Sequence, residues 1–150
     1  MRPHHIYPTL EFRVCDAVTK IEEALCLAAL TQAICAKLLK LRRNNLGFRR
    51  YSPHLIAENK WRAMRHGVSG QLIDFGRQAE VPMTHLVSEL LEFVDDVVDE
   101  LGCRAEVAYA ETITREGTSA DRQLAVFNAT GSLHAVVDSV AAETVEGLFS

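Results

Sequence analysis

The sequence predicts an α+β protein that is mainly helical, with one N-terminal strand, a short hairpin and about six helices. Three observations predict this class. Apolar and polar residues alternate over residues 9–16, which is the period of a half-buried strand. Residues 70–81 contain two short strand-like runs around a Gly-Arg turn. Elsewhere apolar residues recur every three or four positions, between residues that cap and stop helices.

Length and composition predict one domain or fragment over residues 1–150, with an ordinary globular balance of 48% hydrophobic and 24% charged residues. A net charge of −4 argues against a general nucleic-acid binder. No apolar run approaches the ~20 residues of a membrane span, so no membrane partner is expected. The four cysteines have no C-x-x-C spacing and no signal peptide is visible, which predicts free thiols and a cytoplasmic location.

The predicted N-terminal strand places Glu11 and Arg13 on one face, about 7 Å apart along the strand. A carboxylate is a ligand that Mg²⁺ prefers, and a guanidinium matches phosphate oxygens. Together they could hold a metal and a phosphoryl group, although a strand with a solvated polar face is the more common explanation of this pattern. The strand's partners are expected upstream of this sequence rather than in the later hairpin.

The first helix is expected over residues 17–44, buried on most sides and capped by Asp16 or Thr19. The second is expected from Pro53 to His66, with Ser52 as its cap and a stop at Gly67. Further helices are expected over residues 85–101, 105–115, 118–129 and 133–148, most of them ending at glycines.

The second helix carries a candidate anion-binding surface. Asn59, Arg62 and His66 share one face, and Arg65 lies beside Arg62. The alternative is a solvated helix in which Glu58 pairs with Arg62. The sequence contains none of the phosphate-binding glycine loops, zinc-protease motifs or nucleophile elbows that would mark another enzyme class.

Three segments together resemble the C-terminal part of the bacterial carboxylate-amine ligases of the glutamate–cysteine ligase type 2 family. They are Leu-Glu-Phe-Arg-Val at residues 10–14, Asn-Lys-Trp-Arg-Ala-Met-Arg-His-Gly at residues 59–67 and Thr-Ser-Ala-Asp-Arg at residues 118–122. Members commonly have tyrosine where this sequence has His66. The resemblance covers essentially the whole chain.

The resemblance implies the C-terminal portion of a glutamine synthetase-like fold and a reaction that uses ATP and Mg²⁺. A glutamate-like carboxylate is phosphorylated, and an amine such as that of cysteine attacks the acyl phosphate. By the resemblance, Glu11 would be a catalytic Mg²⁺ ligand and Arg13 would contact the transferred phosphate. Asn59, Arg62 and Arg65 would face nucleotide or substrate.

Full members of this family are more than twice as long, so the N-terminal catalytic half is expected to be missing and the isolated chain to be inactive. The alternative is a non-catalytic helical interaction module that forms a homodimer by pairing an exposed strand edge. A weaker third reading makes the basic residues between Lys37 and Arg50 a surface for an anionic partner.

Overall fold

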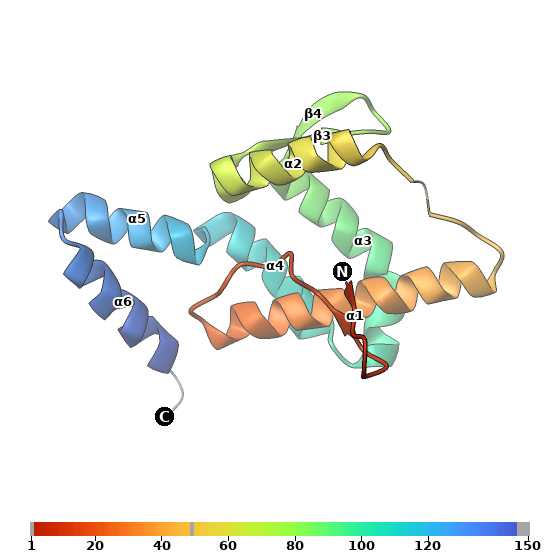
Figure 1. Cartoon of the computed structure of the whole chain (residues 1–150), viewed down its shortest axis with the longest axis horizontal. Coiled ribbons are helices and arrows are strands. Elements are labelled where there is room, and N and C mark those ends of the chain that lie inside the picture. Colours follow the sequence, from red (N-terminus) through yellow and green to blue (C-terminus); the bar gives the residue numbers. More distant parts are fainter. Residues whose placement is uncertain (1, 49, 147–150) are drawn as a thin grey trace.

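The computed structural model describes residues 2–48 and 50–146 (Figure 1). It contains six α-helices, one 3₁₀ turn and two antiparallel two-stranded hairpins, which confirms the mainly helical α+β class. The strands are β1 (Arg2–Pro3), β2 (Leu10–Glu11), β3 (Gln71–Asp74) and β4 (Ala79–Pro82). The helices are α1 (Ile21–Arg43), α2 (Pro53–His66), α3 (Met83–Leu101), α4 (Arg104–Glu116), α5 (Ser119–Thr130) and α6 (Leu133–Val145).

The hydrophobic core lies where α1, α3 and α4 pack together. The apolar stripe predicted for α3 is buried there, with Val94 fully enclosed and Val98 nearly so. Ala29 and Ala33 of α1 face this stripe, and their small side chains let the helices approach closely. The left-handed backbone of Gly102, with φ of 65°, ends α3 and turns the chain directly into α4.

Helix α1 differs from the expectation in its start and its burial. It begins at Ile21 with Lys20 as the N-terminal flanking residue, so neither Asp16 nor Thr19 caps it. Its buried residues follow one face only, and Ile21 and Leu25 are each 51% exposed. The reason is that α1 packs mainly against α3 and α4, on one side. By length and composition α1 also meets the criteria for a membrane-spanning helix, contrary to the expectation; core helices and signal sequences can meet them too.

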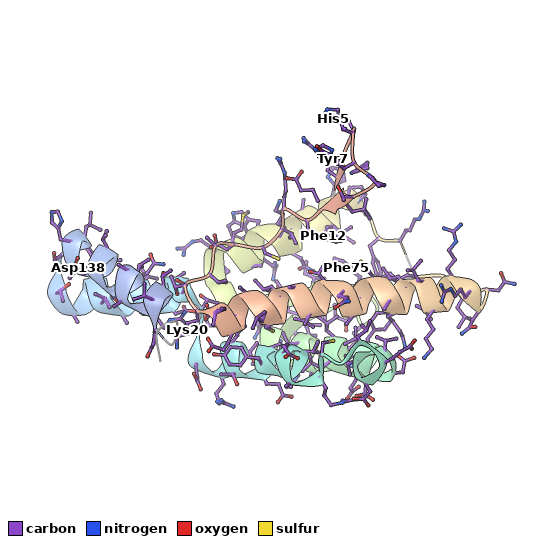
Figure 2. All side chains as sticks on the ribbon, turned by 90° about the horizontal axis from the view of Figure 1, so that it is seen from below. His5, Tyr7, Phe12, Lys20, Phe75 and Asp138 are labelled. Carbon is purple, nitrogen blue, oxygen red and sulfur yellow. The ribbon has the colours of Figure 1, made fainter. Side chains whose placement is uncertain are left out.

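The predicted strand over residues 9–16 is mostly absent, since only Leu10 and Glu11 form a strand. It pairs antiparallel with β1, whereas a partner outside this sequence was expected. In this pairing Arg2 stands opposite Glu11 and Pro3 opposite Leu10. Its apolar face is uncovered, with Val14 73% exposed. Alternation alone does not form a strand without a surface to cover it. Figure 2 shows His5 and Tyr7 at the tip of this hairpin, standing away from the helices.

The second hairpin and the C-terminal helices follow the predicted order. β3 and β4 pair antiparallel as expected, with Ile73 opposite Glu80, and α2 packs on β3. α5 and α6 form a helical hairpin that extends from the core (Figure 1). α6 ends at Val145, before the predicted end; residues 147 and 148 lie outside the described residues.

Candidate functional site

Glu11 and Arg13 lie together, as the strand pattern predicted, but they contact each other. Arg13 Nε is 2.9 Å from Glu11 Oε1, and Arg2 Nε is 3.6 Å from Glu11 Oε2. The side chains of Glu11 and Arg13 are 41% and 63% exposed. In this chain the Glu11 carboxylate is therefore partly neutralised by two guanidinium groups, and both catalytic candidates are open to solvent.

A magnesium ion needs more than Glu11. Mg²⁺ gives up its water ligands only where several oxygen ligands converge. Within residues 2–48 and 50–146 no three His, Cys, Asp or Glu side chains come together in a way that could hold a metal. These residues therefore do not fit a complete magnesium site, and Glu11 offers a single carboxylate toward one.

On α2, Arg62 is held by two carboxylates. Its guanidinium lies 2.8 Å from Glu58 and 2.8 Å from Glu80 of β4. The hydrogen bond that Arg62 donates to Glu58, followed by the one it donates to Glu80, raises the pKa of Arg62. The pairing with Glu58 is the arrangement expected for a solvated helix. Arg65 is exposed and forms no ion pair in the described part of the chain, so it is the arginine of α2 that is open to an added anion.

Asn59 binds the backbone of β3. Its Oδ1 accepts a hydrogen bond from the Ile73 N–H at 2.8 Å, and its Nδ2 donates to the Ile73 carbonyl at 2.8 Å. These bonds fix the angle between α2 and the hairpin. Among the described residues, no hydrogen bond or ion pair joins Asn59, Arg62 or Arg65 to the Glu11–Arg13 pair, and their part in nucleotide or substrate binding stays a prediction.

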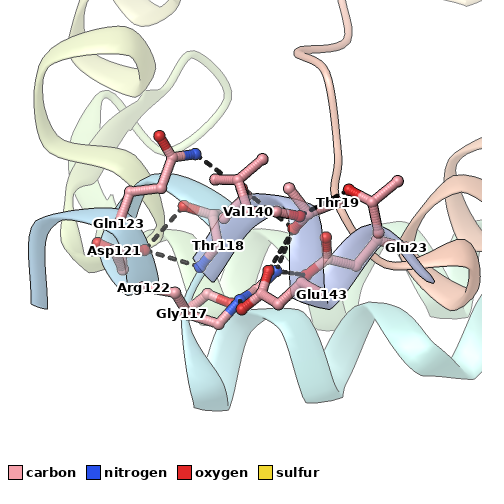
Figure 3. Close-up of polar contacts among 11 residues, drawn as sticks. Thr19, Glu23, Gly117, Thr118, Asp121, Arg122, Gln123, Val140 and Glu143 are labelled. Carbon is pink, nitrogen blue, oxygen red and sulfur yellow. Dashed lines mark hydrogen bonds and ion pairs between the residues drawn. The ribbon is translucent and has the colours of Figure 1, made fainter. Parts of the chain in front are cut away.

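Sequence reasoning missed a polar cluster around Arg122 (Figure 3). The Arg122 guanidinium on α5 lies 2.8 Å from Glu23 of α1 and 2.8 Å from Glu143 of α6. It also donates to the Thr19 hydroxyl at 3.1 Å, and Thr19 in turn donates to Glu143. The only sequence feature that pointed to Arg122 was its place in the Thr-Ser-Ala-Asp-Arg segment. Its carboxylate partners Glu23 and Glu143 lie 99 positions before it and 21 positions after it.

The cluster is partly buried, and this burial affects the pKa values of its titratable groups. Glu23 is only 3% exposed, and its Oε2 is buried without a hydrogen-bond partner in the described residues. Burial alone would raise the pKa of Glu143, but hydrogen bonds from Thr19 and Arg122 outweigh it and lower that pKa. Burial, followed by the charge of Glu23, raises the pKa of the nearby Cys26 thiol to about 11. The cluster thus joins α1, α5 and α6 around one cation.

Comparison with known proteins identifies the family. The model of the glutamate-cysteine ligase family 2 matches residues 1–139, so the chain belongs to this family. A protein of Solibacter usitatus named "Putative glutamate--cysteine ligase 2" is 55% identical over all 150 residues. Proteins of the same name from Roseiflexus castenholzii and Chloroflexus aggregans are 55% and 56% identical over 148 residues, 99% of this chain.

These relatives are much longer than the chain. It covers 39% of the Solibacter protein and 38% of the Chloroflexus protein, and it corresponds to their C-terminal part. No solved structure matches it. The resemblance recognised in the three sequence segments is therefore confirmed, including the partial length.

Proposed function

We propose that this chain is the C-terminal part of an ATP- and Mg²⁺-dependent carboxylate-amine ligase of the glutamate–cysteine ligase type. The observation that supports this most is the family match across residues 1–139, which includes the Glu11–Arg13 pair and the arginines of α2. The substrates would be a glutamate-like carboxylate and an amine such as that of cysteine. The free thiols of the described residues fit a cytoplasmic location.

The proposed chemistry needs positioning and charge neutralisation rather than a covalent nucleophile. Arg13 would neutralise charge on the transferred phosphoryl group and Arg65 would bind an anionic group of nucleotide or substrate. Glu11 would exchange its pairing with Arg13 and Arg2 for a place in a magnesium site whose other ligands come from outside this chain. Arg62, held by Glu58 and Glu80, would keep the local geometry of α2.

The isolated chain should be inactive for a structural reason. Glu11 is the one carboxylate that it offers to the magnesium site, and its described residues contain no group of three side chains that could hold a metal. The apolar side chains of the segment that carries Glu11 and Arg13 are also not covered by other parts of the described chain. ATP-dependent ligation by the purified 150-residue chain would contradict this part of the proposal.

The test uses a protein with the full length of the relatives and the two variants Glu11→Gln and Arg13→Ala. Removing one charged contact to a transition state typically costs about 10²–10³-fold in kcat. We expect a loss of this size in both variants, with the far-UV circular dichroism spectrum and Tm retained. The control is Arg115→Ala, an exposed arginine whose carboxylate partner is the adjacent Glu116. Turnover that survives both changes would show that the site is elsewhere.

A second candidate, a non-catalytic interaction module, is favoured by one observation. Ile6, Tyr7 and Val14 are each more than 60% exposed, which leaves apolar side chains without a covering surface. Light scattering after size-exclusion chromatography separates the candidates. A dimer that dissociates in Val14→Lys, together with a full-length protein that lacks turnover, would favour the module.

A further inference from the structure

A shallow pocket lies between the C-terminal half of α2 and the start of β3, and the proposed function leaves most of its residues unused. Its volume is about 390 Å³, within the size range of small-molecule sites. Figure 1 shows α2 and the β3–β4 hairpin side by side at this place. The pocket is lined by Trp61, Arg62, His66, Ser69, Gly70, Gln71 and Glu80.

Two rings form one corner of the pocket. Trp61, the single tryptophan of the sequence, is 53% exposed. Its ring centroid is 6.0 Å from that of His66, and the two planes meet at 87°. A flat ligand ring that stacks on one of them would therefore meet the other edge-on, and both geometries are favourable for aromatic groups. The ring arrangement favours a planar heterocycle.

The charges in the pocket disfavour a phosphate group as its main occupant. Arg62 is the guanidinium on the pocket wall, and Glu58 and Glu80 already bind it at 2.8 Å each. Both contacts occupy the Arg62 guanidinium, and Glu80 itself lines the pocket, so the pocket offers an anion no unpaired arginine. A neutral ring carrying hydrogen-bond donors is compatible with this environment.

Gln71 supplies the polar group that a base needs. Its side chain is exposed and makes no hydrogen bond to the described residues, so its carboxamide is free to donate and to accept. A glutamine carboxamide matches the N6 amino group and N7 of adenine with two hydrogen bonds. Arg65 lies one helical turn after Trp61 on the same face, where it could meet a phosphate outside the pocket.

We infer that this pocket binds the adenine ring of the nucleotide, stacked at the Trp61–His66 corner and read by Gln71. The inference rests on the proposed function, since that function supplies the nucleotide. The inference names the residues that would select the base. Trp61 and His66 would contact the face of the adenine ring, and Gln71 would bind its hydrogen-bonding edge.

The test titrates the purified chain with adenosine, guanosine and ribose 5-phosphate while the fluorescence of Trp61 is recorded. Because the sequence has one tryptophan, all tryptophan emission comes from this pocket, and N-acetyltryptophanamide titrated in parallel corrects for light absorbed by the purine. We expect saturable quenching with adenosine, weaker binding of guanosine and no response to ribose 5-phosphate. Gln71→Ala should weaken adenosine about tenfold and remove the preference over guanosine.

Isothermal titration calorimetry measures adenosine affinity in variants that lack the fluorescent Trp61. Trp61→Ala should weaken adenosine roughly tenfold or more, as expected for the loss of a stacking partner. Gln32→Ala changes an exposed glutamine on α1 that does not line the pocket; it is the matched control and should leave adenosine affinity unchanged. Equal affinity in the wild type, Trp61→Ala and Gln71→Ala, or no adenosine binding at all, would overturn the inference.

The two proposals can fail separately. If adenosine does not bind while the full-length protein turns over ATP and loses turnover in Arg13→Ala, the pocket assignment is wrong and the proposed function stands. If adenosine binds with the expected variant effects while the full-length protein has no ligase activity, the pocket is a purine site and the proposed function fails.

Discussion

Arg122 shows how one side chain can hold three helices together. It pairs with two carboxylates from α1 and α6 and is itself only 22% exposed at the side chain. Removing one member of a buried ion cluster leaves the remaining charges without compensation, which is more costly than losing an exposed pair. The stability of the α5–α6 hairpin against the core is therefore expected to depend on this residue.

We predict that Arg122→Ala lowers the free energy of unfolding by about 3 kcal/mol, measured by urea denaturation. Arg104→Ala is the matched control, because Arg104 also binds two carboxylates, Asp95 and Asp99, but at the surface. Arg104→Ala should lower the free energy of unfolding by about 1 kcal/mol or less. Equal losses in the two variants would show that burial of the Arg122 cluster does not matter.

At this scale the sequence predicted near neighbours and missed distant ones. The two-residue spacing of Glu11 and Arg13 predicted that they lie together, and they do, although the strand itself ends at Glu11. The pairing of Arg62 with Glu58 follows from helical spacing. The contact between Arg122 and Glu23 depends on tertiary packing, which no local spacing encodes.

At the scale of elements, ion pairs fix how helices meet. Asp96 of α3 receives Lys37 and Lys40 of α1 at 2.7 and 2.8 Å. The hydrogen bond from Lys37, followed by that from Lys40, lowers the pKa of Asp96 from 3.8 to about 2. A carboxyl group with a lowered pKa stabilises the folded state above its unfolded pKa, and this contribution disappears as the pH falls toward the folded pKa.

We predict that Asp96→Asn is less stable than the wild type by a constant amount between about pH 5 and pH 7. The difference should shrink between about pH 4 and pH 2, because Asp96 then becomes protonated in the wild type as well. Urea denaturation across this pH range measures it. Asp138→Asn on α6, an exposed residue without an ion pair in the described part of the chain, should show no such pattern.

Helices were predicted better than strands because their signals are local. Gly102 and Gly131 end α3 and α5 in the left-handed conformation, and the capping box of Thr118 and Asp121 begins α5. Helix α2 begins at Pro53 as predicted, but its expected cap Ser52 makes no side-chain capping hydrogen bond. The strand over residues 9–16 needed neighbours that its own alternation could not supply.

At the scale of the molecule, the chain leaves large apolar side chains exposed on several of its helices. The outer face of α1 and the helices α5 and α6 expose large side chains, including Leu25, Leu39, Leu124 and Leu133. The predicted burial of α1 on most sides was wrong for this chain, because composition reports how apolar a helix is but not which protein segment covers it. Relatives more than twice as long have additional chain that could do so.

We predict that Leu25→Gln changes the stability of the isolated chain by no more than about 0.5 kcal/mol, since Leu25 is 51% exposed. In a full-length protein the same change should cost about 1–2 kcal/mol if the outer face of α1 becomes covered. Urea denaturation of both proteins tests this. Val94→Ala, in the core, should destabilise both, and equal effects of Leu25→Gln in the two contexts would contradict the prediction.

The bonds between Asn59 and Ile73 also have a consequence for association. Ile73 stands opposite Glu80 in the ladder, while its N–H and carbonyl bind Asn59 on the other side of the strand. Open backbone groups along a sheet edge are a template on which another molecule can add a strand. The carboxamide of Asn59 occupies the backbone groups of Ile73 on that edge, so another strand could pair there only by displacing this side chain.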